Sequence, residues 1–588
     1  MHLLRSFQAL SALLLCAGCV MIVNVGTVAT AAAPNVLLIM TDDQGYGDIA
    51  AHGNTMIQTP ALDRLHAESV RLTNFHVDPT CSPTRSALMT GRYSTRTGVW
   101  HTIQGRSFMD PAETTLAEVF AANGYRTGHF GKWHLGDNAP LRPQDQGFEE
   151  VLMCGGGGVT QTPDWWGNDY FDDVYRDESG RPEQFSGYCT DVWFREATRF
   201  IEESQQQQRP FFCYLPTNAP HGPYNVADEY ADPYRQQGVP RDMAKFYGMI
   251  TNIDENVGRL LVTLDQRGLT NDTIVIFMTD NGTAAGVAGR RESSDGWQGF
   301  NAGMRGQKGS QYDGGHRVPC FIRWPDGQLS GGRDIDVLAA HVDLLPTLAE
   351  LCGLNFQPDR PLDGRSLVPV LRRTSRRRLV GPTLFVHSQR IEFVQKWRNS
   401  AVMTQQWRLV DGKQLYDMSS DPGQQQDIAG QHPDVVKRLT AAYEGWWESL
   451  SPVFYEYVRI DLGSPAENPA SLTCHDWHTG DKPVPWHQGM VANDPPHNGD
   501  WAVNVVEQGR YRFTLRTRPA GVVRELPPGV ARVEIGGQTR EIPVEAGQLR
   551  SDIELTLPAG PAMLRCSLVP TTGEPRGAYF VDVERLGE

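Results

Sequence analysis

The chain has 588 residues, of which 40% are hydrophobic and 21% are charged, and its formal net charge is -15. This length exceeds that of one ordinary hydrophobic core, so we expect two or more domains, and the composition is that of a globular protein. The negative charge argues against nucleic-acid binding, which depends on clustered lysine and arginine. An anionic substrate would need a local cluster of positive groups.

The N-terminal segment has the features of an export signal. Arg5 precedes a long apolar run, and the small residues of "ATAAAP" follow it. This pattern predicts a signal peptide over residues 1–31 and an exported protein, either secreted or in a bacterial periplasm. The apolar run is also long enough to remain as a membrane anchor, so that alternative stays open.

Residues 34–365 have the pattern of an α/β domain. Short continuous apolar runs occur in "NVLLIM" (35–40), "PFFCYL" (210–215) and "TIVIFM" (273–278), as in strands that are buried on both faces of a sheet. Between the last two runs, apolar residues recur at helical spacing until Gly268, which would end the helix. We expect a large mixed sheet flanked by helices.

Two smaller units follow. Residues 366–452 predict an α+β subdomain with strands in "TLFVHS" and "WRLVDGKQLYDM" and a helix over 433–450. Residues 455–588 predict an antiparallel β-sandwich, because "GRYRFTLRT" alternates apolar and polar side chains and "ARVEIGGQTREIPV" reads as a hairpin.

Acidic and amide side chains follow two of the buried strands. Asp42 and Asp43 end "LLIMTDD", and Asp280 and Asn281 end "VIFMTDNG". Open α/β sheets place their sites at such strand ends, where grouped carboxylates repel one another unless a cation lies between them. Oxygen donors suit Ca²⁺ or Mg²⁺ rather than Zn²⁺. Alternatively, each acid is simply a turn or capping residue.

Basic side chains occupy comparable positions. In "GHFGKWHLG", Lys132 and His134 are two residues apart, so both would face one side of an extended segment. His221 follows "PFFCYLPTNAP", and Lys308 lies in "RGQKGSQYDGG". Together they would form the local positive cluster, although single residues of these types are usually surface groups.

Cys81 opens the segment "CSPTRSALMTGRY". The cysteines beyond residue 31 are scattered and form no CxxC pair, so a zinc ribbon is disfavoured. In an exported protein one or two disulfides can form, but the sequence does not assign partners. Setting Cys81 aside leaves an odd number of cysteines, which predicts at least one free thiol.

The segment from Cys81 to Gly91 resembles the signature of the formylglycine-dependent (type I) sulfatases. The motifs "TDDQGYGD", "GKWHLG", "NAPH", "TDNG" and "RGQKGSQYDGG" match that family in order and spacing across about residues 34–450. The resemblance implies an alkaline-phosphatase-like fold and an arylsulfatase-like hydrolase. It also implies that a maturation enzyme converts Cys81 to formylglycine.

The resemblance also implies roles for individual residues. One Ca²⁺, with Mg²⁺ as the alternative, would be held by Asp42, Asp43, Asp280, Asn281 and the modified Cys81. The formylglycine hydrate would be held and polarised by Arg85 and Lys132. After attack on sulfur, the leaving alcohol would be protonated by His221 with help from Lys308. A covalent sulfo-enzyme would then be resolved when His134 removes a proton from the second hydroxyl.

The leading substrate class is a carbohydrate sulfate, with aryl sulfates as model substrates. His316 is a departure from the family pattern and would contact either the substrate or its own loop. Trp165, Trp166 and Trp297 would stack on sugar rings or pack their own loops. Two other functions remain open: a formylglycine-dependent phosphonate or phosphodiester hydrolase, and a glycan-binding protein that has lost catalysis.

Overall fold

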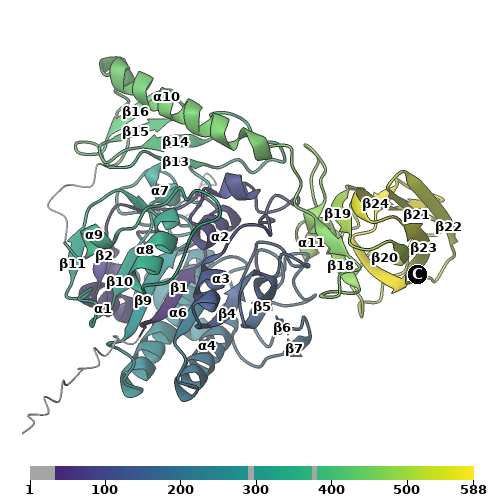
Figure 1. Ribbon diagram of the computed structural model, residues 1–588, viewed down its shortest axis with the longest axis horizontal. Coiled ribbons are helices and arrows are strands. Elements are labelled where there is room, and N and C mark those ends of the chain that lie inside the picture. Colours follow the sequence, from purple (N-terminus) through teal and green to yellow (C-terminus); the bar gives the residue numbers. More distant parts are fainter. Residues whose placement is uncertain (1–32, 289–296, 374–380, 588) are drawn as a thin grey trace, which may run out of the picture. The chain divides into compact units, whose positions relative to one another are not determined.

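A ten-stranded mixed sheet forms the centre of the molecule (Figure 1). The computed structural model describes residues 33–288, 297–373 and 381–587, so the predicted signal peptide lies outside the described residues. In spatial order the strands are β11 (Arg333–Ile335), β2 (Val70–Leu72), β10 (Cys320–Arg323), β9 (Thr273–Thr279), β1 (Asn35–Thr41), β8 (Phe211–Pro216), β4 (Arg126–Lys132), β5 (Glu150–Cys154), β6 (Val174–Asp177) and β7 (Pro182–Gln184).

The middle of this sheet is parallel. β1 pairs in parallel with β9 on one side and β8 on the other, and β4 and β5 continue the parallel run. All three apolar runs of the sequence are therefore strands, and every residue of β1, β8 and β9 is buried. β10 and β6 are antiparallel to their neighbours, which makes the sheet mixed as expected.

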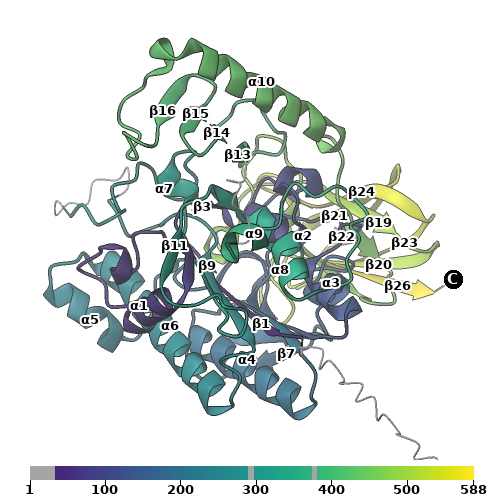
Figure 2. The ribbon, with the colours of Figure 1, turned by 60° about the vertical axis from the view of Figure 1, so that its left-hand side comes forward.

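Helices cover both faces of the sheet, and β1 shows how its side chains divide between them. Val36, Leu38 and Met40 belong to one core cluster, whereas Leu37 and Ile39 belong to the other, because successive strand residues point to opposite faces. The first cluster includes residues of α2 (Cys81–Thr90), α3 (Leu116–Ala122), α8 (Leu344–Leu351) and α9 (Val368–Leu371). The second includes residues of α1 (Pro60–Glu68), α4 (Cys189–Gln206), α5 (Asp228–Gln236) and α6 (Arg241–Gln266). Figure 2 shows α4 and α6 side by side.

A four-stranded antiparallel sheet follows in the chain. It consists of β13 (Leu384–His387), β14 (Ser400–Met403), β15 (Trp407–Val410) and β16 (Gln414–Asp417). One face packs against α10 (Pro433–Leu450), which buries Leu439, Tyr443 and Trp446 as predicted. The other face packs against Ala87 of α2 and so supports the helix that begins at Cys81.

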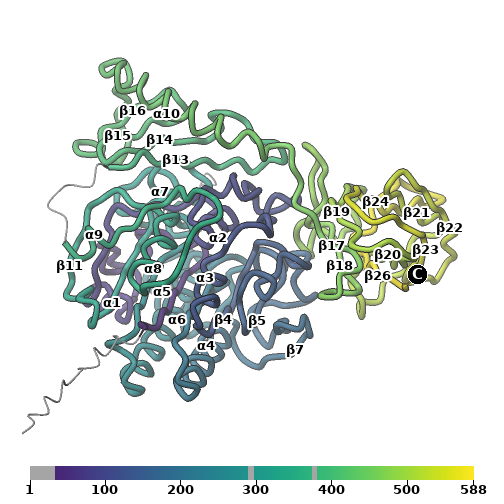
Figure 3. The backbone as a smooth tube through the Cα atoms, viewed as in Figure 1, coloured from purple at the N-terminus to yellow at the C-terminus, as the bar shows by residue number. Residues whose placement is uncertain are grey.

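The C-terminal segment forms two further sheets around one core cluster, and Figure 3 traces it in yellow-green. One sheet contains β17 (Ile460–Leu462), β19 (Trp501–Val505), β24 (Gly560–Pro570), β21 (Gly529–Ile535), β22 (Gln538–Val544) and β25 (Arg576–Gly577). The other contains β18 (Ala470–Thr473), β26 (Phe580–Gly587), β20 (Gly509–Arg516) and β23 (Ser551–Leu557). β17 pairs with β19 in parallel, so this sandwich is not wholly antiparallel. Phe108 and Leu141 join the same cluster, and their burial attaches the sandwich to the central domain. The domain boundaries at residues 365 and 455 remain a prediction.

The cysteines of the described part of the chain are buried except Cys352, which is partly exposed, and they form no disulfide there. Cys320 packs in the first core cluster, Cys154 and Cys213 in the second, and Cys566 in the sandwich. The predicted free thiol is confirmed. Within the same described residues, no helix is both long enough and apolar enough to cross a bilayer.

A buried ion pair joins the four-stranded sheet to the central domain. Arg408 of β15 donates to Asp313 at 2.9 Å and to Asn74 at 3.2 Å, and both charged side chains are at most 1% exposed. His76 and His316 are in contact through their Nδ1 atoms at 2.9 Å in the same network. These two histidines and Asp313 could form a metal site by geometry, but the Arg408 guanidinium already supplies the positive charge there.

Replacing Arg408 with alanine should lower the free energy of unfolding by about 3–5 kcal/mol, because it leaves the Asp313 carboxylate buried without its partner. The urea midpoint measures this loss. Lys413→Ala is the matched control, since Lys413 is an exposed cation at the end of the β15–β16 turn and should contribute less than about 0.5 kcal/mol. Equal midpoints for the two variants would contradict the assigned role of the pair.

Candidate active site

The acidic residues meet because β1 and β9 are parallel neighbours. Thr41 and Thr279 are paired in register at the last position of each strand, so the next residues of both strands emerge side by side. Asp42, Asp43 and Asp280 are each at most 3% exposed. The backbone N–H of Asp43 donates to Asp280 Oδ1 at 3.0 Å, which fixes the two strand ends against each other.

Cys81 reaches the same point as the first residue of α2, with Thr80 as its N-cap. Its thiol donates to Asp42 Oδ1 at 3.5 Å, and the side chain is buried. One ligand atom from each of Asp42, Asp43, Cys81 and Asp280 lies within 4.8 Å of the others. The structure therefore brings together four of the five residues that the sequence predicts for a metal site.

Three cationic side chains pair with this acidic cluster. Arg85 Nη2 donates to Asp280 Oδ2 at 2.8 Å, and Lys132 Nζ donates to Asp42 Oδ2 at 2.5 Å. Lys308 Nζ lies 2.5 Å from Asp43 Oδ1. Each carboxylate thus has its own cation, which is the arrangement that buried charges need.

The pKa values of the buried groups differ because the cations compensate the carboxylates unequally. Burial, and then the charge of Asp280, raises the pKa of Asp42 to about 8. Burial also acts to raise the pKa of Asp43, but Lys308 and His221 outweigh it and hold that pKa below its ordinary value. For Cys81, burial and the adjacent Asp42 raise the thiol pKa to about 12, so the unmodified side chain is a neutral thiol and a poor nucleophile.

The cluster fits a hard divalent cation. Asn281 Nδ2 donates to Asp43 Oδ1 at 2.9 Å, which leaves Asn281 Oδ1 buried without a hydrogen-bond partner. A cation placed among these oxygens would satisfy that orphaned atom and would relieve the repulsion that raises the pKa of Asp42. The donor set is dominated by carboxylate and amide oxygens, as Ca²⁺ prefers.

Two histidines complete the site from different loops. His221 Nε2 faces Asp43 Oδ2 at 3.7 Å, and His134 Nε2 contacts the carbonyl of Thr102 at 2.9 Å. The expectation that Lys132 and His134 share one extended segment is wrong. β4 ends at Lys132, and His134 has a left-handed φ of 64°, which turns its ring away from the strand direction.

Burial lowers the pKa of both rings. For His221 the pKa falls to about 3, with the charge of Lys308 as the second cause. For His134 it falls well below its ordinary value, with Lys132 as the second cause. Both histidines are therefore neutral near pH 7 in the free protein.

The glycine run 155–158 packs between these two rings. A Cβ atom on Gly157 would lie 2.1 Å from His134 Cε1, and one on Gly158 would lie 3.2 Å from His221 Nδ1. The run therefore lacks side chains because it passes directly against the histidines. The Gly157 N–H donates to Gln161 Oε1 at 2.9 Å, which anchors the loop.

A cavity of about 120 Å³ opens onto Cys81, and His134, His221 and Lys308 also line it. Among the lining residues that the sequence analysis did not identify are Gln161, Arg390 and Trp486. They come from three segments far apart in the chain, and none lies in a motif. Only tertiary structure could have placed them here.

The C-terminal sandwich supports this wall directly. His475 Nε2 lies 3.2 Å from Gln161 Oε1, and the carbonyl of Trp486 accepts from the N–H of Thr162 at 3.0 Å. The Trp486 side chain is 38% exposed. The accessory domain thus contributes to the shape of the cavity at Cys81.

The other predicted contact residues lie elsewhere. His316 is fully buried in the network around Asp313, so its ring contacts other protein side chains rather than a substrate. Trp165 and Trp166 line a separate cavity of about 410 Å³ between the central domain and β18, β20 and β26. Trp297 packs beside Tyr247 at a ring distance of 6.2 Å.

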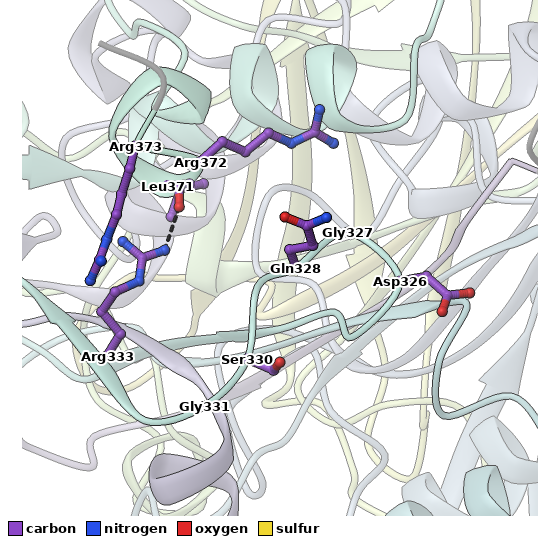
Figure 4. A pocket seen from close by; sticks show the side chains of 9 residues that line it. All are labelled: Asp326, Gly327, Gln328, Ser330, Gly331, Arg333, Leu371, Arg372 and Arg373. Carbon is purple, nitrogen blue, oxygen red and sulfur yellow. Dashed lines mark hydrogen bonds between the residues drawn. The ribbon is translucent and has the colours of Figure 1, made fainter. Parts of the chain in front are cut away.

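A further cavity of about 640 Å³ is lined in part by the segment that follows β10, and Figure 4 shows its lining. Arg333 donates to the carbonyl of Leu371 there, and Arg372 and Arg373 complete a basic wall. Asp326 of this cavity donates its N–H to Asn271, which lies just before β9. The cavity therefore lies near the N-terminal end of β9, whereas Asp280 follows its C-terminal end.

Comparison with known proteins identifies the family of this chain. The family model described as Sulfatase matches residues 34–354, which contain the three aspartates, Cys81, Arg85, Lys132 and Lys308 of the site. The chain belongs to the sulfatase family. It is thus a sulfuric ester hydrolase with the fold of the alkaline phosphatase superfamily, as the sequence resemblance predicted. A second model, described as the C-terminal part of N-sulphoglucosamine sulphohydrolase, matches residues 307–445.

Curated relatives agree with this placement. Human arylsulfatase A is 32% identical over 384 residues, which cover 58% of this chain and 68% of the relative. N-acetylgalactosamine-6-sulfatase of Canis lupus familiaris is 32% identical over 371 residues, which cover 58% of this chain and 66% of the relative.

Solved structures share the fold of this sulfatase. The crystal structure of Ps i-CgsB in complex with k-i-k-neocarrahexaose is 27% identical with a TM-score of 0.62, covering 70% of this chain and 92% of that chain. A structure solved with its substrate D-glucosamine-2-N,6-O-disulfate is 20% identical with a TM-score of 0.56. That likeness covers 72% of this chain and 100% of the other, and it shows the fold alone.

Replacing Gly157 with alanine should lower kcat for aryl sulfate hydrolysis by about 10- to 100-fold, because the added methyl group displaces the His134 ring. Gly445→Ala is the control, since that helical glycine has open space around it and tolerates a side chain. Unchanged kcat in Gly157→Ala would show that the position of His134 is not critical.

Proposed function

We propose that this sulfatase hydrolyses a carbohydrate sulfate ester, using formylglycine formed from Cys81 and a bound Ca²⁺. The observation that carries the proposal is the convergence of Cys81 with three buried carboxylates and their paired cations at one sheet edge. A structural role alone would not require so many buried charges, because each costs free energy to desolvate.

The aldehyde hydrate supplies an oxygen nucleophile, and the metal ion supplies positive charge that favours its ionised form. The residues proposed to hold the ion are Asp42, Asp43, Asp280 and Asn281, together with position 81. Arg85 and Lys132 are fixed by the carboxylates around position 81, and their charges stabilise negative oxygen there and on the sulfuryl group.

His221 is proposed to protonate the leaving alcohol, and the positive charge of Lys308 is proposed to help it. Burial disfavours the charged form of Lys308, but the carboxylates, Asp43 first, outweigh it and raise its pKa, so Nζ keeps its proton. His221 donates its Nδ1 proton to the carbonyl of Gly222 at 2.6 Å, which leaves Nε2 facing the site. An anionic ester entering beside this ring raises the pKa of His221, and Nε2 then becomes a proton donor.

His134 is proposed as the base of the second half-reaction. The Thr102 carbonyl only accepts hydrogen bonds, so His134 Nε2 carries the proton and Nδ1 holds the free lone pair. Nδ1 is buried and has no partner among the described residues. The lowered pKa keeps this nitrogen unprotonated at neutral pH, ready to accept a proton.

Carbohydrate is proposed as the leaving group for three reasons: one relative is named N-acetylgalactosamine-6-sulfatase, a structural neighbour was solved with k-i-k-neocarrahexaose, and Trp486 lies at the cavity wall. An aromatic face suits the apolar side of a sugar ring. An exported location, directed by residues 1–31, is part of the same proposal.

The deciding experiment compares an aryl sulfate with the matching aryl phosphate on protein whose residue 81 has been characterised by peptide mass. We expect the sulfate to be preferred, with activity proportional to the fraction of formylglycine. Preference for the phosphate would instead support the phosphonate and phosphodiester branch.

Cys81→Ala should abolish turnover while the protein remains folded, because one small side chain at the start of α2 contributes little to the core. Circular dichroism and the urea midpoint supply the folding control. Normal turnover in this variant would refute the formylglycine mechanism. No turnover in fully converted wild-type protein, combined with saccharide binding, would favour the glycan-binding alternative.

A further inference from the structure

The cavity at Cys81 adjoins a larger groove of about 980 Å³. Lys308 and Arg390 line both spaces, so they stand where the narrow cavity meets the groove. A Cβ atom on Gly309 would lie 3.9 Å from Arg390 Nη1, which places the guanidinium beside the residue that follows Lys308. A substrate that fills the cavity at Cys81 can therefore extend past this border into the groove.

The groove is positive although the chain as a whole carries a charge of -15. Its described lining includes Arg305 and Arg390, together with Lys308, which is already paired with Asp43, and it contains no aspartate or glutamate. Arg305 stacks on Tyr312 at 3.9 Å and donates to neutral oxygens, and no carboxylate of the described residues forms an ion pair with it. Such a local cluster is what an anionic ligand requires in an acidic protein.

Arg390 itself is exposed, and in the described parts of the chain its guanidinium has neither an ion pair nor a hydrogen bond. Its backbone has a left-handed φ of 46°. The surrounding loop is nevertheless well fixed: Ser388 donates its N–H to Asn399 at 3.0 Å, and Gln395 donates its N–H to the Gln389 side chain at 2.8 Å. An unpaired cation on a fixed, strained loop is a feature that binding sites often have.

We propose that Arg390 forms an anion subsite and that the substrate is a saccharide with a second negative group next to the sulfate that is hydrolysed. This inference rests on the proposed sulfatase function. The planar guanidinium binds carboxylate and sulfate oxygens in pairs, so either a uronate or a second sulfate meets the requirement. The scissile ester occupies the cavity at Cys81, and the second anion lies in the groove.

The test measures inhibition of aryl sulfate hydrolysis by three saccharides. N-acetylgalactosamine 6-sulfate has one anionic group, N-acetylgalactosamine 4,6-disulfate has two sulfates, and the disaccharide of glucuronate with N-acetylgalactosamine 6-sulfate adds a carboxylate. Wild-type protein should bind at least one of the doubly charged compounds about ten-fold more tightly than the singly charged one. Which of the two is preferred identifies the second anion.

In Arg390→Ala the ratio of the inhibition constants should fall close to one, and Arg390→Lys should retain only part of the preference because it loses the paired geometry. Arg540→Ala is the control, since Arg540 is an exposed arginine of β22 outside both cavities, and it should keep the full ratio. A wild-type protein without the preference, or an Arg390→Ala protein that keeps it, would overturn the proposal.

Calorimetry on the full-length Cys81→Ala protein repeats the comparison without turnover. Suppose that the protein hydrolyses no aryl sulfate but still binds a doubly charged saccharide more tightly, and that this preference needs Arg390. That result would refute the proposed function but support the anion subsite. Normal sulfatase activity with no preference in calorimetry would refute the subsite alone.

Discussion

The rest of the site depends on the repulsion between buried carboxylates that lie close together at the C-terminal ends of β1 and β9. Asp42, Asp43 and Asp280 are almost completely removed from water, where uncompensated charge is costly. The fold meets this requirement with Arg85, Lys132 and Lys308, each brought in by a different segment. The raised pKa of Asp42 and the orphaned oxygen of Asn281 show that these cations alone do not complete the balance.

Each layer of the fold contributes to holding this point. The parallel register of β1 and β9 aligns the strand ends, and the four-stranded sheet supports α2, whose first residue is Cys81. A glycine run allows the backbone to pass against two histidine rings. The C-terminal sandwich reaches the cavity through Trp486 and through the contact of His475 with Gln161, so it is a part of the site.

The sequence predicted the features that depend on local pattern. The hydrophobic runs predict the buried strands at 35–40, 210–215 and 273–278, and the structure has a buried strand at each. The motif residues that follow these runs lie at the strand ends, as the sequence predicts. Features that depend on long-range packing were not predictable: the left-handed turn at His134, the parallel pairing of β17, and the positions of Arg390 and Trp486. Loop position and aromatic character predict that Trp165 and Trp166 either contact a sugar or pack their own loops, whereas the structure places both in another cavity.

The central claim is that this acidic cluster is a metal site whose charge balance is completed by Ca²⁺. Its most direct test is calorimetric titration of Ca²⁺ into metal-stripped wild-type protein, with Asp280→Asn as the comparison. One equivalent of Ca²⁺ should bind per wild-type chain, with proton release near pH 7 from Asp42, whose pKa is about 8 before the ion enters. Binding should be much weaker in Asp280→Asn. Absence of Ca²⁺ binding to folded wild-type protein would contradict the claim.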